Sequence, residues 1–177
     1  SAPQGFRWGG YADNYEDLSQ ALLQRGVVTV TLSHYDIEEP MSAGQRFSDV
    51  YPGIQTGKRN DPAVDRYEDG LFVLGQLAQL NERLAGGGPR LDLERLAVGG
   101  HSSGTLTALH LAGMPVRDRS GQIFARHQDP RIKALVLFSY PLEYRGPERD
   151  DLTQVGNVAG LHVAGSKDHP QFRNTSY

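Results

Sequence analysis

The sequence contains no cysteine, which excludes disulfide bonds, thiolate metal ligands and a cysteine nucleophile together. No apolar run approaches the ~18 residues that a membrane-spanning helix needs, and no signal-peptide pattern is recognisable. An excess of basic charge is also lacking: the formal net charge is −3 and the pI is about 6.0, which argues against a nucleic-acid-binding protein. These absences leave the compartment open.

The composition and the order of predicted elements indicate an α/β protein. A hydrophobic fraction of 38%, a charged fraction of 22% and a length of 177 residues suit one globular domain over 1–177. Because helices alternate with continuously apolar strands, we expect a mostly parallel sheet covered by helices on both faces. Helices are predicted at 13–25, 61–85 and 103–111, strands at 27–32, 96–98, 132–138 and 161–165, and irregular stretches at 34–60, 113–128 and 140–157.

A short motif, Gly100-His101-Ser102-Ser103-Gly104, matches G-x-S-x-G and stands between a predicted strand and a predicted helix. In that setting α/β-hydrolases hold a nucleophilic serine in a strained turn whose flanking glycines avoid bulk. The following helix would point its N-terminus at the site, so the Ser103 amide could bind an oxyanion. A chance match is the alternative, but the flanking elements favour Ser102 as a nucleophile.

A serine nucleophile requires a histidine base and a carboxylate that orients it, in the chain order Ser, Asp or Glu, His for this kind of site. Asp168 is the predicted carboxylate, because it follows the strand predicted at 161–165 at the sheet edge where such sites form. A turn aspartate that only caps the backbone is the alternative for this residue. Glu143 and Asp150, after the preceding strand, are weaker candidates.

None of the six histidines is predicted to be the catalytic base. His169 is adjacent to the predicted acid, and side chains so close in sequence rarely align as acid and base. His34 follows a predicted strand, where it could line a pocket but not act as the base. The others have structural expectations: His101 packs beneath the motif, His110 lies in a helix, His127 on a loop and His162 in a strand.

Several blocks of the sequence resemble the predicted dienelactone-hydrolase and platelet-activating-factor acetylhydrolase branch of the α/β-hydrolases. The specific block is RLDLERLAVGGHSSGTLTALHLAG at residues 90–113. Suggestive blocks are residues 9–26, the helix that begins with Arg66 and Asp69, and DPRIKA at residues 129–134. The resemblance covers most of the chain and implies an α/β-hydrolase fold with a mostly parallel sheet flanked by helices.

The chain departs from the family in ways that bear on the site. The family's loop after its third strand carries a His-Gly pair, whereas residues 6–10 read FRWGG, so the second oxyanion donor would be the Trp8 amide. The acetylhydrolases place their acid where this chain has Phe138-Ser139-Tyr140, which favours Asp168. The family's first strands, last strand and histidine have no counterpart in these residues. We therefore expect a segment of a longer polypeptide that lacks those strands.

The predicted activity is the hydrolysis of carboxylic esters through an acyl-enzyme on Ser102. Aromatic and apolar side chains in the loops at 34–60 and 140–157 suit an apolar or aromatic ester, and the substrate-binding candidates are His34, Tyr35 and Tyr140. The expected partner is a small-molecule or polymeric ester, with no nucleic acid, no membrane span and no cofactor. No metal-ligand cluster is visible, and Gly86-Gly87-Gly88 lacks the lysine of a P-loop.

Two other functions fit the same sequence. The missing histidine and the missing His-Gly pair suit a catalytically inactive hydrolase-like domain that binds a ligand or a partner protein. Thioesterase or amidase chemistry would use the same serine on a different acyl group. A reactive serine separates the enzymes from the binding domain, and a substrate panel separates the enzymes from each other. The sequence leaves the oligomeric state open.

Overall fold

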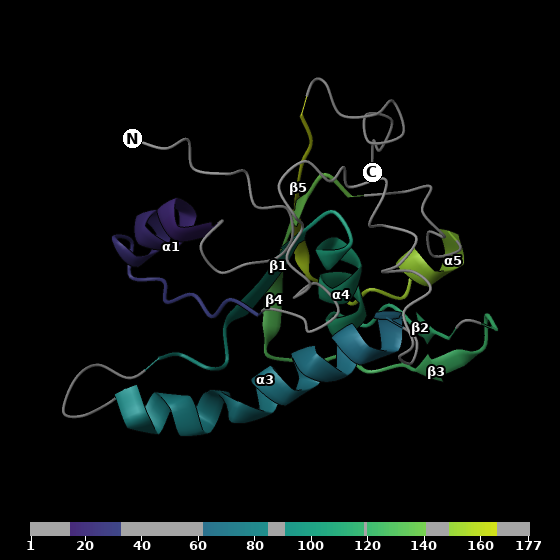
Figure 1. Ribbon diagram of the computed structural model, residues 1–177, viewed down its shortest axis with the longest axis horizontal. Coiled ribbons are helices and arrows are strands. Elements are labelled where there is room, and N and C mark those ends of the chain that lie inside the picture. Colours follow the sequence, from purple (N-terminus) through teal and green to yellow (C-terminus); the bar gives the residue numbers. More distant parts are fainter. Residues whose placement is uncertain (1–14, 33–61, 85–90, 119, 141–148, 166–177) are drawn as a thin grey trace, which may run out of the picture. The chain divides into compact units, whose positions relative to one another are not determined.

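The computed structural model describes residues 15–32, 62–84, 91–118, 120–140 and 149–165 (Figure 1). The chain divides into two compact units, Ser1–Pro62 and Ala63–Tyr177, and each is described by itself. In the first unit, helix α1 (Glu16–Leu23) confirms the helix predicted there. It ends before Gly26, whose φ of 78° is the left-handed conformation that commonly follows a helix.

The predicted strand at 27–32 is wrong, because these residues have no regular secondary structure. Val27, Val28 and Val30 are 46%, 43% and 49% exposed. β-branched residues favour a strand where a neighbouring strand supplies hydrogen bonds and a surface to pack against. Within 15–32, the described part of this unit, no second extended segment supplies either, so propensity alone does not produce a strand.

The second unit contains a three-stranded parallel sheet in the order β1-β4-β5. Figure 1 shows helix α4 beside β1 and β4, the strands with which it is in contact. The second unit is therefore α/β, with a parallel sheet flanked by helices, as the alternating pattern predicts. The elements are α3 (Pro62–Leu84, starting at the unit boundary), β1 (Leu96–His101), α4 (Gly104–Leu111), β2 (Val116–Arg117), β3 (Ile123–Ala125), β4 (Ile132–Phe138), α5 (Arg149–Leu152) and β5 (Ala159–Val163).

Burial across the sheet is uneven, and full cover on both faces is confirmed only for the central strand. In β4, buried Leu135 and Leu137 alternate with half-buried residues. β1 instead alternates half-buried with exposed residues. In β5, Leu161 is 57% exposed and Val163 is 42% exposed. Strands at the edge of a sheet have one paired neighbour, so they gain less cover than the strand between them.

The elements β2, β3 and α5 lie in stretches that the sequence predicted to be irregular. A single carboxylate organises the hairpin between β2 and β3: Asp118 Oδ1 accepts hydrogen bonds from the Ser120 amide at 2.8 Å and the Gln122 amide at 3.0 Å. Arg117 then pairs with Asp151 of α5 at 2.7 Å, and this aspartate is 1% exposed. Such elements are held by polar contacts and are too short to show a hydrophobic period, which is why the pattern missed them.

The core of the second unit lies between helices α3 and α4 and the sheet. Helices α3 and α4 pack closely where Gly70 meets Leu111, since a Cβ on the glycine would lie 2.8 Å from Leu111 Cδ1. This close packing fixes the first turns of α3 against α4. The buried apolar side chains are Val64, Tyr67, Leu74, Leu77, Ala108, Leu109, Leu111, Ala112, Met114, Val116, Ile132, Leu135, Leu137 and Tyr140.

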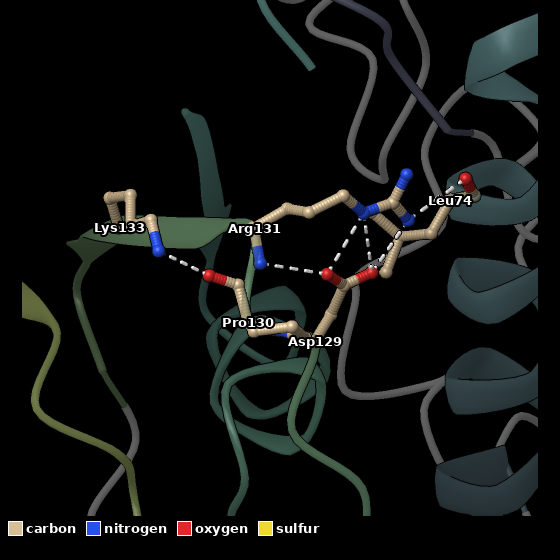
Figure 2. A network of polar contacts seen from close by, with 5 residues as sticks. All are labelled: Leu74, Asp129, Pro130, Arg131 and Lys133. Carbon is tan, nitrogen blue, oxygen red and sulfur yellow. Dashed lines mark hydrogen bonds and ion pairs between the residues drawn. The ribbon is translucent and has the colours of Figure 1, made fainter. Parts of the chain in front are cut away.

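A polar network fastens the start of β4 to α3 (Figure 2). Arg131 Nη2 donates to Asp129 Oδ2 at 2.6 Å and to the Leu74 carbonyl at 3.2 Å. The Asp129 side chain lies in the interior, because the residue is only 6% exposed. Hydrogen bonds from Arg131 hold the pKa of the Asp129 carboxyl below its usual value. The network thus joins the loop before β4 to the middle of the long helix.

We expect Asp129→Asn to lower the free energy of unfolding by roughly 2–3 kcal/mol at neutral pH. The pKa of Asp129 is lower in the folded state than its ordinary value of 3.8. Its contribution is therefore present above the unfolded-state pKa and is lost as pH falls through the folded-state value. Urea unfolding at a series of pH values should show wild type and variant converging below about pH 4.

Asp92→Asn is the matched control, because Asp92 also pairs with an arginine, Arg95, but both side chains are largely exposed, at 48% and 79%. Exposed ion pairs contribute little to stability. The control should therefore lose clearly less stability than the Asp129 variant. Equal losses from the two variants would contradict the assigned role of the buried network.

Candidate active site

Ser102 occupies a sharp turn between strand β1 and helix α4, in the setting that the motif predicts. Its φ of 52° lies in the left-handed region, which costs a non-glycine residue roughly 1–3 kcal/mol. Its amide donates to the Phe138 carbonyl at 2.9 Å, and its carbonyl accepts from the Thr105 amide at 3.0 Å. These two bonds join the turn to β4 on one side and to α4 on the other. The Ser102 side chain is exposed, as a nucleophile must be.

Gly100 shows why the turn requires a residue without a side chain. A Cβ at this position would lie 2.2 Å from both the carbonyl carbon and the oxygen of Gly104, and 2.7 Å from the Thr105 nitrogen. These are backbone atoms, so no side-chain movement could relieve the clash. Gly104, which we expected to be small for the same reason, has nothing within 4 Å of a Cβ. Only the first glycine of the motif is therefore required by close approach.

Ser103 stands at the N-cap of α4 with φ −59° and ψ −24°, and its side chain makes no capping hydrogen bond. Amides at the start of a helix have no intrahelical partner, and the helix dipole makes this end favourable for negative charge. The Ser103 hydroxyl accepts instead from Arg66, with Nη1 at 2.6 Å from Oγ. The residue after the candidate nucleophile is thus held by a cation from α3.

The carboxyl ends of the three parallel strands meet beside Ser102. The register pairs His101 with Phe138 and Phe138 with Val163, so the strands end level with one another. Ser139 leaves β4 with φ 50°, and its amide donates to the Val163 carbonyl at 2.8 Å. Two left-handed serines therefore follow neighbouring strands at the edge where α/β proteins build their sites.

Sequence reasoning missed both Arg66 and Ser139 as neighbours of the site. A signal for Arg66 exists: extending the buried stripe of α3 backward from Leu77 and Leu74 by helical turns leads to Gly70 and then to Arg66. Arg66 is indeed buried, at 9% exposed. A charged residue on an apolar helix face generally has a specific partner. For Ser139 the sequence offers no such signal, because the left-handed turn depends on how β4 ends beside β5.

The structure brings two of the predicted site residues together, Ser102 and Ser103. Tyr140, predicted to contact substrate, is 1% exposed and packs edge-on against His162, with ring centroids 6.4 Å apart at 82°. Its visible role is therefore packing, and a substrate contact stays a prediction. The other predicted site residues lie outside the described residues: Trp8, His34, Tyr35, Asp168 and the weaker acid candidate Glu143.

The described histidines agree with most of the expectations. His110 is buried in α4 with Nδ1 3.2 Å from the Met114 carbonyl, and burial lowers the pKa of its imidazole. His127 is exposed outside any strand, and His162 lies in β5. The expectation for His101 is wrong: it is exposed, because β1 side chains alternate and this residue falls on the exposed face. None of these histidines forms a hydrogen bond with Ser102.

Two searches of the described residues bear on other functions. No helix among them is long and apolar enough to cross a membrane. Within the same residues, no group of three or more His, Cys, Asp or Glu side chains could hold a metal ion. Comparison of the chain with protein-family models, with curated proteins and with solved structures gave no match. The function must therefore be inferred from the residues and their geometry.

Proposed function

We propose that the chain has an α/β-hydrolase fold and that Ser102 is the nucleophile of a carboxylic ester hydrolase. The observation that carries the proposal is the left-handed Ser102 between β1 and α4, with no space for a Cβ at Gly100. This geometry lifts a hydroxyl out of the end of a parallel strand and directs a helix N-terminus toward it. A turn with no functional role has no reason to retain this strain.

In the proposed reaction, Ser102 Oγ attacks the ester carbonyl carbon while a base removes its proton. The tetrahedral oxyanion accepts a hydrogen bond from the Ser103 amide, and from the Trp8 amide as a second donor. The alcohol then leaves with the proton, and an acyl group remains on the serine. Water attacks the acyl-enzyme in the second half, releasing the carboxylic acid and restoring the hydroxyl. An apolar or aromatic ester remains the preferred substrate class.

Asp168 is the proposed residue that orients the histidine base. β4 lies between β1 and β5, so the chain leaves β5 one strand beyond the strand next to Ser102. The carboxyl end of β5 is level with those of β1 and β4 through the parallel register. An acid in the turn after β5 would therefore start from the same sheet edge as the nucleophile, which supports the choice.

A catalytically inactive hydrolase-like binding domain is the second candidate. It is favoured by one observation: among the described residues, no histidine contacts the Ser102 hydroxyl through a hydrogen bond. A serine without a base reacts slowly, although catalytic hydrogen bonds are often loose before substrate binds. The two candidates differ in the reactivity of Ser102, and that reactivity can be measured directly.

The test is the intact mass of the native protein before and after treatment with a fluorophosphonate probe, followed by peptide mapping. We expect one adduct, and we expect it on Ser102 rather than on Ser103 or Ser139. Heat-denatured protein is the control, since a serine activated by its folded surroundings should lose its reactivity. No adduct on a native protein of 19.4 kDa would overturn the ester-hydrolase proposal and leave the binding domain in its place.

A further inference from the structure

Arg66 extends from α3 to the turn that carries the candidate nucleophile. Its Nη1 donates to Ser103 Oγ at 2.6 Å, a contact between residues 37 positions apart in the chain. The arginine is only 9% exposed, so its guanidinium has lost most of its contact with water. Burying a charged group is costly unless it is well partnered. A purely structural helix–helix contact could be made at lower cost by an apolar side chain.

The partner of Arg66 is a side chain that would ordinarily have another task. Serine at an N-cap commonly accepts a hydrogen bond from an amide within the first turn of its helix. Ser103 makes no such bond and has helical backbone angles. Its hydroxyl is instead directed to the arginine, which fixes the rotamer of the residue. The amides at the start of α4 are thus not covered by the serine side chain.

We infer that Arg66 is a positioning residue for the oxyanion site, acting through Ser103. The inference rests on the proposed ester-hydrolase function and extends it to a residue outside the motif. Arg66 holds the peptide unit whose amide receives the oxyanion, and its permanent positive charge lies one side chain away from the developing negative charge. Both effects grow in the transition state, so they should act on kcat more than on KM.

The packing of α3 gives Arg66 a rigid base from which to act. One helical turn after Arg66, Gly70 is in close contact with Leu111 at the other end of α4. α3 therefore touches α4 at its C-terminal end through Gly70 and the N-cap of α4 through Arg66. A side chain that reaches from a helix fixed in this way can hold geometry within the small tolerance that catalysis requires.

The test compares Arg66→Met, Arg66→Lys, Ser103→Ala and the Arg66→Met/Ser103→Ala double variant with wild type. We measure the rate of fluorophosphonate labelling, and kcat and KM for p-nitrophenyl butyrate. Arg66→Met should lower the labelling rate and kcat by roughly 10- to 100-fold, with KM within about twofold. Arg66→Lys should recover part of this loss, because it keeps the charge but not the planar fork.

The double variant separates positioning through Ser103 from an independent effect. Ser103→Ala keeps the backbone amide and removes only the acceptor, so it should resemble Arg66→Met. If Arg66 acts through that hydroxyl, the double variant should be no slower than the slower single variant. Full multiplication of the two effects would overturn the inference that Arg66 works through Ser103.

Arg131→Met is the matched control for stability. Arg131 also reaches from one element to another, donating to the Leu74 carbonyl of α3, but does not contact the serine turn. It should lose stability to urea without a matching loss of kcat. If wild type labels and Arg66→Met labels equally fast, this inference alone fails. If wild type does not label at all, the proposed function fails and the inference fails with it.

Discussion

Ser102→Ala is expected to abolish ester hydrolysis, with kcat/KM for p-nitrophenyl butyrate falling by at least about 10⁴-fold. The reason is chemical, because no other atom in the turn can form the acyl-enzyme. Stability should change little, since alanine retains a Cβ and meets the same strain at φ 52°. Steady-state hydrolysis and fluorophosphonate labelling measure the first effect, and urea unfolding measures the second. A variant that stays folded and loses all labelling would establish Ser102 as the nucleophile.

Ser139→Ala provides the discriminating comparison for that experiment. Ser139 has φ 50° at the end of the neighbouring strand, so the two serines share their backbone strain and their edge of the sheet. They differ in the next element of the chain, because only Ser102 leads directly into a helix N-terminus. Labelling that survives Ser102→Ala but disappears in Ser139→Ala would contradict the assignment and move the nucleophile to β4.

The serine turn could be predicted because its constraints are local in sequence. A strand, two small residues, a serine and a helix follow one another within Leu96–Leu111, and each has its own signal. The long amphipathic pattern of α3 and the apolar run of β4 were equally recognisable. For these elements the local preference and the tertiary surroundings agree, so the structure confirms them.

The features that escaped prediction depend on contacts between distant residues. The run 27–32 has the composition of a strand but, among the described residues of its unit, no partner. The bond from Arg66 to Ser103 joins positions far apart in the chain, and only the packing of α3 on α4 brings them together. The hairpin is fixed by one carboxylate, Asp118, whose role becomes visible only once the chain has turned around it.

Gly100→Ala should be the most destabilising single-methyl change in the turn. The added Cβ would lie 2.2 Å from two backbone atoms of Gly104, a separation that real Cβ contacts essentially never show. Relief requires moving the start of α4 away from the end of β1, which would break the bond between the Thr105 amide and the Ser102 carbonyl. We expect a loss of more than about 3 kcal/mol in the free energy of unfolding. Urea unfolding measures this loss.

The expected loss has a functional consequence as well. Any folded fraction of the Gly100 variant must hold Ser102 in a displaced turn, so labelling per folded molecule should fall together with stability. This coupling arises from the geometry, since the same approach of β1 to α4 creates the clash and orients the hydroxyl. A folded variant that labels at the wild-type rate would show that the close approach is not needed for reactivity.

Gly104→Ala is the matched control, because it adds the same methyl group in the same motif. A Cβ at Gly104 meets nothing within 4 Å, and Gly104 is the first residue of α4. Alanine is a better helix former than glycine, so stability should stay the same or rise by up to about 1 kcal/mol. A large loss at Gly104 equal to that at Gly100 would mean that the turn rejects bulk generally. The predicted contrast instead assigns the constraint to one backbone approach, beneath the serine that we propose does the chemistry.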